Sequence, residues 1–198
     1  MPEVEIPNPE ELEELRNKEF TRRVAITTAI YAVMLAIAAL GGNNAMKDML
    51  LAQQQASDQW AFYQAKVIRE HEYRIQQKRL EVELAERGAG MAPEARQQYE
   101  ALLAEFTAET KRYNAEKKDI EKDAKKLEHE RDVNRNKDPY FDFAEVLLQI
   151  AIVMSSVSIL SSSRLMYGLS LILALGGTFL MINGYTLLVT LPFFHGGH

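Results

Sequence analysis

Three apolar blocks constrain the fold of this chain more than any other feature of its sequence. The block 24–40 contains no charged residue, 143–160 contains only Glu145, and 165–191 contains none. A helix needs about 20 mainly apolar residues to cross the hydrocarbon core of a bilayer. We therefore predict an all-α integral membrane protein. Its three transmembrane helices are placed at 24–42, 139–163 and 165–191.

The lead-in before the first block, residues 1–23, is acidic in its first part. Asn8 can cap a helix whose first residue is Pro9, so we expect a short helix there. A cleaved signal peptide is the alternative for the first block, because small residues follow its apolar core. Signal peptides begin with a positively charged region, which this lead-in does not have at its start, so we favour a retained transmembrane helix.

The segment 43–138 is dense in charge but nearly neutral. Residues 43–141 hold nineteen acidic and eighteen basic side chains, as expected for a solvated helix with many ion pairs. Proline and glycine are absent from 44–87 and from 94–137, and both occur in the stretch between. This pattern predicts two helices of similar length joined by a turn near 88–92. We therefore expect an antiparallel coiled-coil helical hairpin between the first and second transmembrane helices.

Two joints are expected where this hairpin meets the transmembrane helices. Asp138 can cap a new helix that begins at Pro139, which would end the second arm of the hairpin. Gly41 and Gly42 supply a matching break after the first transmembrane helix. Beyond the third transmembrane helix, residues 192–198 form a C-terminal tail.

Apolar residues repeat with heptad-like spacing along both arms of the hairpin. The second arm has one stripe, which includes Tyr99, Phe106 and Tyr113. The first arm has two stripes: a first row of Met49, Ala56, Trp60, Tyr63 and Val67, and a second row of Ala61, Ala65, Ile68, Ile75 and Val82. One row can pack on the second arm. The other then remains for a neighbouring copy, which predicts a homo-oligomer of high order.

An aromatic cluster of Trp60, Phe62 and Tyr63 lies in the first arm. We favour a role in packing arms or protomers together, because aromatic side chains bury a large area and can specify the geometry of an oligomer. A binding patch for another protein or for lipid headgroups is the alternative.

The stretch NNAMKDMLLAQQQASDQWAFYQAKVIREH at 43–71, and above all WAFYQAK at 60–66, resembles a family of short bacterial membrane proteins known as domain of unknown function four-three-three-seven. Members of that family have one N-terminal span, a coiled-coil middle and two C-terminal spans, so the resemblance implies this layout for nearly the whole chain. It implies no reaction, cofactor or catalytic residue. The layout is also similar to that of polysaccharide chain-length regulators, which hold a long helical hairpin between spans. The third span of this chain is a difference from that layout.

Basic residues near the ends of the apolar blocks indicate how the protein sits in the membrane, because such residues are enriched on the cytoplasmic side. Four basic residues precede the first block closely, and only Lys47 follows it closely. Arg164 lies between the second and third blocks, whereas three basic residues just before the second block argue the other way. We favour a bacterial inner membrane location with a cytoplasmic N-terminus and a periplasmic hairpin.

Few residues suggest chemistry. The chain has no cysteine, which excludes disulfides, thiolate metal sites and cysteine nucleophiles. His195 and His198 could chelate a transition metal, but two histidines in a tail fall short of the three or four ligands of a dedicated site. No phosphate-binding loop, zinc motif or catalytic triad order occurs. We therefore expect no enzymatic activity and no cofactor, and the net charge of −5 gives no reason to expect nucleic acid as a partner.

Gln149 and Ser156 lie seven residues apart in the second transmembrane helix. Polar residues inside a membrane are costly and often mark a pathway, so these two could line a pore. In the alternative that we favour, Gln149 bonds to a neighbouring helix.

These features favour a non-enzymatic, homo-oligomeric membrane protein that serves as a scaffold or a partner-binding platform. An oligomeric channel or transport accessory, with a pore lined by the second transmembrane helix, is the alternative function. The expected partners are further copies of the chain and membrane lipids, with another membrane protein as an additional candidate.

Overall fold

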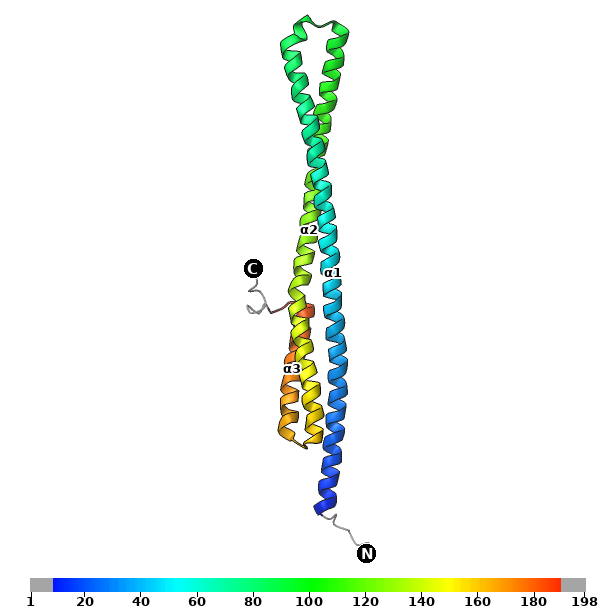
Figure 1. Cartoon of the computed structure of the whole chain (residues 1–198), viewed down its shortest axis with the longest axis vertical. Coiled ribbons are helices and arrows are strands. Elements are labelled where there is room, and N and C mark those ends of the chain that lie inside the picture. The colour runs from blue at the N-terminus through cyan, green and yellow to red at the C-terminus, as the bar shows by residue number, and fades with distance from the viewer. Residues whose placement is uncertain (1–8, 190–198) are drawn as a thin grey trace. The chain divides into compact units, whose positions relative to one another are not determined.

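The computed structural model describes residues 9–189, and nearly all of them are helical (Figure 1). Helix α1 comprises Pro9–Arg87, the short 3-10 helix η1 comprises Gly88–Gly90, α2 comprises Pro93–Leu160 and α3 comprises Arg164–Thr186. No strand occurs between residues 9 and 189, so the predicted all-α class is confirmed.

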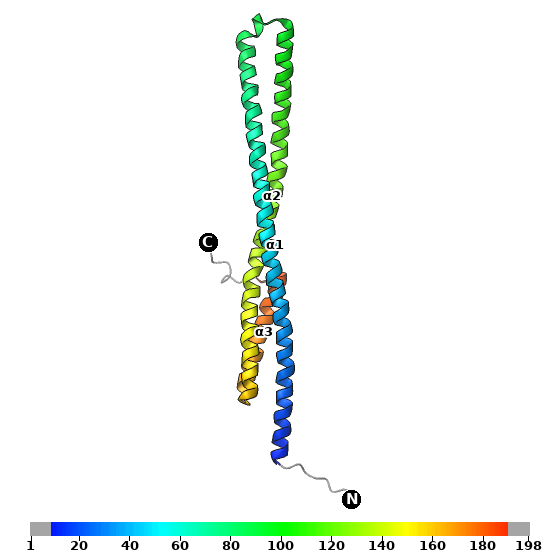
Figure 2. The ribbon, with the colours of Figure 1, turned by 45° about the vertical axis from the view of Figure 1, so that its right-hand side comes forward.

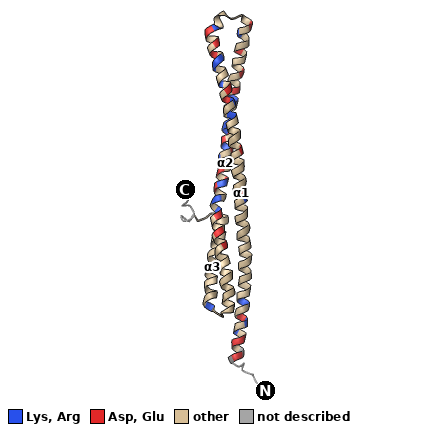
Figure 3. Cartoon of the chain, in the orientation of Figure 1, with Lys and Arg blue, Asp and Glu red and all other residues tan. Residues whose placement is uncertain are grey.

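Contacts divide the chain into two compact units. Unit 1 contains Met1–Asp48 and Val133–His198, and unit 2 contains Met49–Asp132. Helices α1 and α2 each contribute to both units, whereas α3 belongs to unit 1 alone. Charged side chains are frequent along the unit 2 segments, and the 24–40 segment of α1 in unit 1 carries none (Figure 3).

Unit 1 has the composition of a membrane bundle. Helices α1, α2 and α3 are each long and apolar enough to cross a membrane, and the mean hydropathy of the most apolar window is 2.2, 2.0 and 2.0 respectively. Many large apolar side chains of these segments are exposed on the outside of the unit, which would be a liability in water and is normal in lipid. They include Ile26, Ile30, Val33, Val146, Val153, Leu169, Ile172, Leu175 and Phe179.

The core of unit 1 joins segments of all three helices, which lie side by side in both views (Figures 1 and 2). Tyr31 and Ala38 of α1, Leu148 of α2, and Ala174 and Met181 of α3 belong to one buried cluster. Small residues allow the backbones to approach, as in other helix pairs in membranes.

Gly177 marks a close approach of α3 to α2. A Cβ atom at this position would lie 2.9 Å from Leu148 Cγ and 3.1 Å from the Ala144 carbonyl oxygen. The carbonyl belongs to the helical backbone and cannot move aside, so only glycine fits there. At one end of the same interface, the Phe141 ring packs against Gly41 of α1 and Gly184 of α3.

Polar side chains inside unit 1 are mostly bonded within the bundle. The hydroxyl groups of Thr28 and Ser155 lie 2.6 Å apart and link α1 to α2. The Thr178 hydroxyl donates to the Ala174 carbonyl at 2.7 Å, and its oxygen lies 3.4 Å from the Met34 sulfur, which places α3 beside α1. Gly177 packs on α2 and the next residue, Thr178, contacts α1. Leu148 of α2, Gly177 of α3 and Met34 of α1 therefore lie at the same height along the bundle.

The expected joints at both ends of the hairpin are wrong. Helix α1 continues through Gly41 and Gly42, and α2 continues through Pro139. A proline inside a helix costs about 3 kcal/mol and a glycine about 1 kcal/mol. Packing offsets these costs, because both glycines are buried against Phe141, and Tyr140 and Phe141 directly after the proline are almost fully buried.

Helix α3 begins and ends with side-chain contacts. The Ser163 side chain accepts a hydrogen bond from the Met166 N–H at its start. After Thr186, Leu187 adopts a left-handed conformation, and its N–H donates to the Asn183 carbonyl. The Asn183 side chain then bonds to both the N–H and the carbonyl of Val189. The helix therefore ends five residues before the end of the uncharged block.

We predict that Gly177→Val destabilises the protein and that Gly168→Val does so much less. Both glycines lie in α3, and a Cβ at Gly168 would meet no atom within 4 Å. Overpacking at Gly177 should cost about 1–3 kcal/mol in the free energy of unfolding. Thermal unfolding of the detergent-solubilised variants measures the difference, and equal midpoints would show that α2 and α3 are not in close contact.

Candidate self-association surface

Most of the first apolar row of α1 faces α2 within unit 2, and only Val67 of the row is exposed. Ala56 is almost fully buried, and Trp60 and Tyr63 are half-buried. The Trp60 indole N–H donates to Glu128 at 2.9 Å. Further along α1, Tyr73 stacks on Tyr113, with ring centroids 5.7 Å apart. As the residue numbers of the contacts increase along α1, those of their partners on α2 decrease. This is the order of contact between helices that run in opposite directions.

Glu70 is the most buried charged residue of this interface, with 3% of its surface exposed. Its carboxylate accepts from the Lys117 ammonium at 2.5 Å and from the Asn114 amide at 3.2 Å, both on α2. Arg74, one turn along α1, forms a further ion pair with it. A buried carboxylate needs partners of this kind, because an unpaired buried charge is strongly destabilising.

The partners of Glu70 decide its protonation. Burial raises the pKa of Glu70, but hydrogen bonds from Lys117 and Asn114 and the charges of Lys117 and Arg74 outweigh this effect. The pKa of Glu70 therefore lies below its ordinary value of 4.5. A hydrogen bond from Lys66 likewise lowers the pKa of Glu116, and the two side chains are 2.6 Å apart.

Tyr113 is surrounded by cations. Hydrogen bonding by Arg69 lowers the pKa of Tyr113, burial opposes this, and Arg112 lowers it further. The Arg112 guanidinium also lies 4.8 Å from the Tyr113 ring centroid, and the Lys66 ammonium lies 5.2 Å from it. Cations near an aromatic face are attracted by its negative charge density. This cluster fixes α2 beside α1 at the middle of unit 2.

The second apolar row of α1 remains largely exposed in unit 2. Ile68, Ile75 and Val82 are 60%, 41% and 54% exposed, and Ala61 and Ala65 are exposed as well. At 100° per residue the row centres on the face of α1 opposite to the one that carries Tyr63 and Glu70. Positions 61, 65, 68, 72, 75, 79 and 82 follow alternating steps of four and three, the spacing of a coiled-coil seam, with the charged residues Glu72 and Arg79 at two of these positions.

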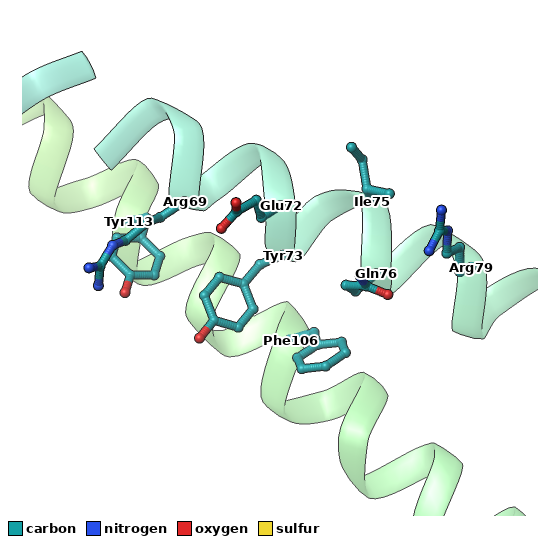
Figure 4. Close-up of a pocket in the computed structure, with 8 residues that line it drawn as sticks. All are labelled: Arg69, Glu72, Tyr73, Ile75, Gln76, Arg79, Phe106 and Tyr113. Carbon is teal, nitrogen blue, oxygen red and sulfur yellow. The ribbon is translucent and has the colours of Figure 1, made fainter. Parts of the chain in front are cut away.

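A groove of about 570 Å³ connects the exposed row to the aromatic interface (Figure 4). Tyr73 from α1 and Phe106 from α2 lie between the two helices, and Arg69 lies beside Tyr113 (Figure 4). Ile75 of the second row lines the same groove. The full lining is Arg69, Glu72, Tyr73, Ile75, Gln76, Arg79, Phe106 and Tyr113. The groove is open to the surroundings of unit 2.

The structure distributes the remaining candidate residues over different surroundings. Phe62 is exposed, with the Lys66 ammonium 5.1 Å from its ring centroid. Tyr99 and Phe106 are half-buried, and Tyr113 is buried. His195 and His198 lie outside the described residues.

The two candidate pore residues lie in unit 1. Gln149 and Ser156 are both exposed on α2, outside the core that α1, α2 and α3 form together. The Ser156 hydroxyl donates to the Ile152 carbonyl at 3.0 Å. Within residues 9–189 the Gln149 amide makes no hydrogen bond.

Sequence reasoning missed Glu70 and its partners. The signal was present, because Glu70 follows Val67 by three residues and so continues the first row. A carboxylate in an apolar row indicates a buried ion pair, which here is made with Lys117. Among residues 9–189, no group of three histidine, aspartate or glutamate side chains is placed to hold a metal ion.

Comparison with known proteins gives one match. A family model described as a domain of unknown function (DUF4337) matches residues 20–187. No curated protein and no solved structure matches the chain significantly.

We predict that Glu70→Gln lowers the thermal midpoint of the protein, whereas Glu83→Gln, an equivalent change at an exposed site on α1, leaves it almost unchanged. Loss of the carboxylate leaves Lys117 without its buried partner, at a cost of about 1–3 kcal/mol. Circular dichroism of the detergent-solubilised protein measures both midpoints.

The loss of thermal stability caused by Glu70→Gln should depend on pH. Because the pKa of folded Glu70 lies below 4.5, the stabilisation by its charge is present above that pH and is lost as the pH falls through the lowered pKa. The difference between the parent protein and Glu70→Gln should therefore shrink below pH 4.5. A difference that stays constant as the pH falls would show that the Glu70 charge contributes nothing.

Proposed function

The chain belongs to the family described as a domain of unknown function (DUF4337), and on that premise we propose that it is a non-enzymatic, homo-oligomeric membrane protein that acts as a scaffold or partner-binding platform. The exposed second row of α1 is the observation that carries this proposal. Its apolar residues lie on the face of α1 opposite Tyr63 and Glu70, and Glu72 and Arg79 occupy the two remaining positions of the heptad spacing. Such seams pack against other helices.

In this proposal, the unit 2 segments of α1 and α2 form an antiparallel coiled-coil hairpin. The reversed order of contacts, from Trp60 with Glu128 to Tyr73 with Phe106, supports this arrangement. Each helix of a pair can bury one stripe on the other. Because α1 carries two stripes, the pair by itself leaves the second one in contact with water.

A second copy of the chain is the partner that we propose for the second row. Copies in one membrane share the same orientation, so each presents the same row at the same height. Contact between the same rows of several copies around an axis along the membrane normal produces a closed bundle. The open groove beside Ile75 adds aromatic surface from Tyr73 and Phe106 to the contact.

We further propose that the protein lies in a bacterial inner membrane with its N-terminus in the cytoplasm and its hairpin in the periplasm. Support comes from the four basic residues just before the first apolar segment of α1. Arg164, in the first turn of α3, would then also lie on the cytoplasmic side.

An oligomeric channel is the second candidate function. It is favoured by one observation, namely that Gln149 and Ser156 share the exposed face of α2. A pore lined by these residues would form only between copies, because both residues face away from the core of their own unit.

We predict that Ala61→Glu combined with Ala65→Glu breaks the oligomer. Two adjacent charges on the seam would repel the same charges on a neighbour and would lose their hydration on contact. The measurement is the mass of the solubilised particle, corrected for detergent, as a multiple of the 22.5 kDa chain. Circular dichroism should show unchanged helix content.

The matched control is Ala104→Glu combined with Ala108→Glu, which places two exposed charges at the same spacing on α2. This variant should keep the mass of the parent particle. If the Ala61 and Ala65 variant also keeps it, the second row is not the assembly surface, and a monomeric parent protein would overturn the proposed function itself.

We predict that Gly90→Cys is labelled by a membrane-impermeant maleimide added to cells whose outer membrane alone is permeable. Glu10→Cys should be labelled only after the inner membrane is opened. The chain has no other cysteine, so each signal reports one site. The reverse labelling pattern would place the hairpin in the cytoplasm.

A further inference from the structure

An unpaired amide on the outside of unit 1 points to a second contact between copies. Gln149 is exposed on α2, between the exposed apolar residues Val146 and Val153. Its side chain has two N–H donors and a carbonyl acceptor, none of which is bonded within residues 9–189. In a soluble protein water would satisfy these groups. In lipid no solvent can do so, and the unpaired amide is costly.

The contacts of unit 1 place Gln149 inside the membrane rather than at its surface. Leu148 packs against Gly177 of α3, and the adjacent Thr178 contacts Met34 of α1. Met34 lies ten residues after Val24 and six residues before Leu40, the ends of an uncharged segment. At 1.5 Å per residue, this level is roughly 9 Å or more from either end.

The residues around Gln149 form a continuous seam. Val146, Gln149, Val153, Ser156 and Leu160 are spaced by alternating steps of three and four residues, and all are exposed. Val153 is 61% exposed. A seam of this spacing allows two helices to pack with a small crossing angle over several turns. Ser156 suits such packing, because it is small and its hydroxyl is already bonded to the Ile152 carbonyl.

We propose that this α2 seam packs on the same seam of a second copy within the membrane, with the two Gln149 amides hydrogen-bonded to each other. The proposal rests on the homo-oligomer proposed above and adds an intramembrane contact to the one in unit 2. An amide is self-complementary, since its N–H of one copy can donate to the carbonyl of the other.

Symmetry favours a second copy of the chain as the molecule that covers the α2 seam. Copies in one membrane are related by an axis along the membrane normal, so residue 149 of each copy lies at the same depth. A different protein would need its own polar group at that depth, whereas another copy necessarily has one. A single polar residue in an apolar seam also fixes the register of the pair, because any shift along the helix separates the two amides.

Disulfide cross-linking of the full chain in lipid membranes tests the proposal, since the chain contains no cysteine of its own. Gln149→Cys should give dimers under mild oxidation, because a disulfide requires Cα atoms within about 7 Å. The control is Leu175→Cys, which is exposed on α3 at nearly the same level, two residues before Gly177. We expect a several-fold higher yield for Gln149→Cys, and equal yields would overturn the proposal.

A second pair of variants measures the contribution of the Gln149 amide to the contact. Val153→Cys reports on the same seam, and adding Gln149→Leu to it should lower the cross-linking yield roughly threefold or more in lipid-diluted samples. Leucine is well tolerated in a transmembrane helix, so this change leaves the fold intact. An unchanged yield would show that the amides do not meet.

Labelling separates a packed seam from a water-filled axis. In unoxidised membranes the thiol introduced by Gln149→Cys should react slowly with a membrane-impermeant maleimide, and fast labelling would overturn the proposal in favour of a pore. The mass of the parent particle distinguishes failure of this intramembrane contact from failure of the proposed homo-oligomer. An oligomer whose position 149 does not cross-link refutes this contact alone, whereas a monomer refutes the proposed function.

Discussion

The packing of this protein is governed by a surplus of apolar helix faces over the partners that the chain itself supplies. In unit 1, three helices cover one another around Tyr31, Leu148 and Met181, and their outer faces remain apolar. Lipid can cover those faces. In unit 2, α2 covers one face of α1, and the opposite face keeps Ile68, Ile75 and Val82 exposed. Water cannot cover that face without cost, since apolar area is more stable when removed from water.

Buried polar groups also need partners, and their pairing makes the register of the helices specific. Among the described residues, buried side-chain polar atoms are paired, as Glu70 is with Lys117 and Thr28 is with Ser155, with the Tyr31 hydroxyl as the exception. Such pairs contribute little net stability, because both partners lose water when they meet. Their effect is to exclude other registers, since a shift of either helix would leave a buried charge or hydroxyl without a partner.

The sequence predicted the helical class, the membrane-crossing helices and the family, because long uncharged blocks and a local motif are properties of the chain alone. It did not predict that α1 and α2 pass unbroken through Gly41 and Pro139. Local signals there favour a break, and the outcome depends on distant residues such as Phe141, which packs against Gly41. The burial of Glu70 likewise depends on Lys117, and no local pattern pairs the two. The coiled-coil hairpin and the oligomer stay predictions.

The short connection between α2 and α3 has a consequence for how unit 1 assembles. Only residues 161–163 separate these helices, so their contacts at Leu148 and Gly177 form between near neighbours in sequence. Thr28 and Ser155, by contrast, are 127 residues apart. Contacts of low sequence separation form first, because closing a long loop costs more entropy before any contact offsets it. The short connection therefore lets α2 pair with α3 at a lower entropy cost than direct closure between Thr28 and Ser155 would carry.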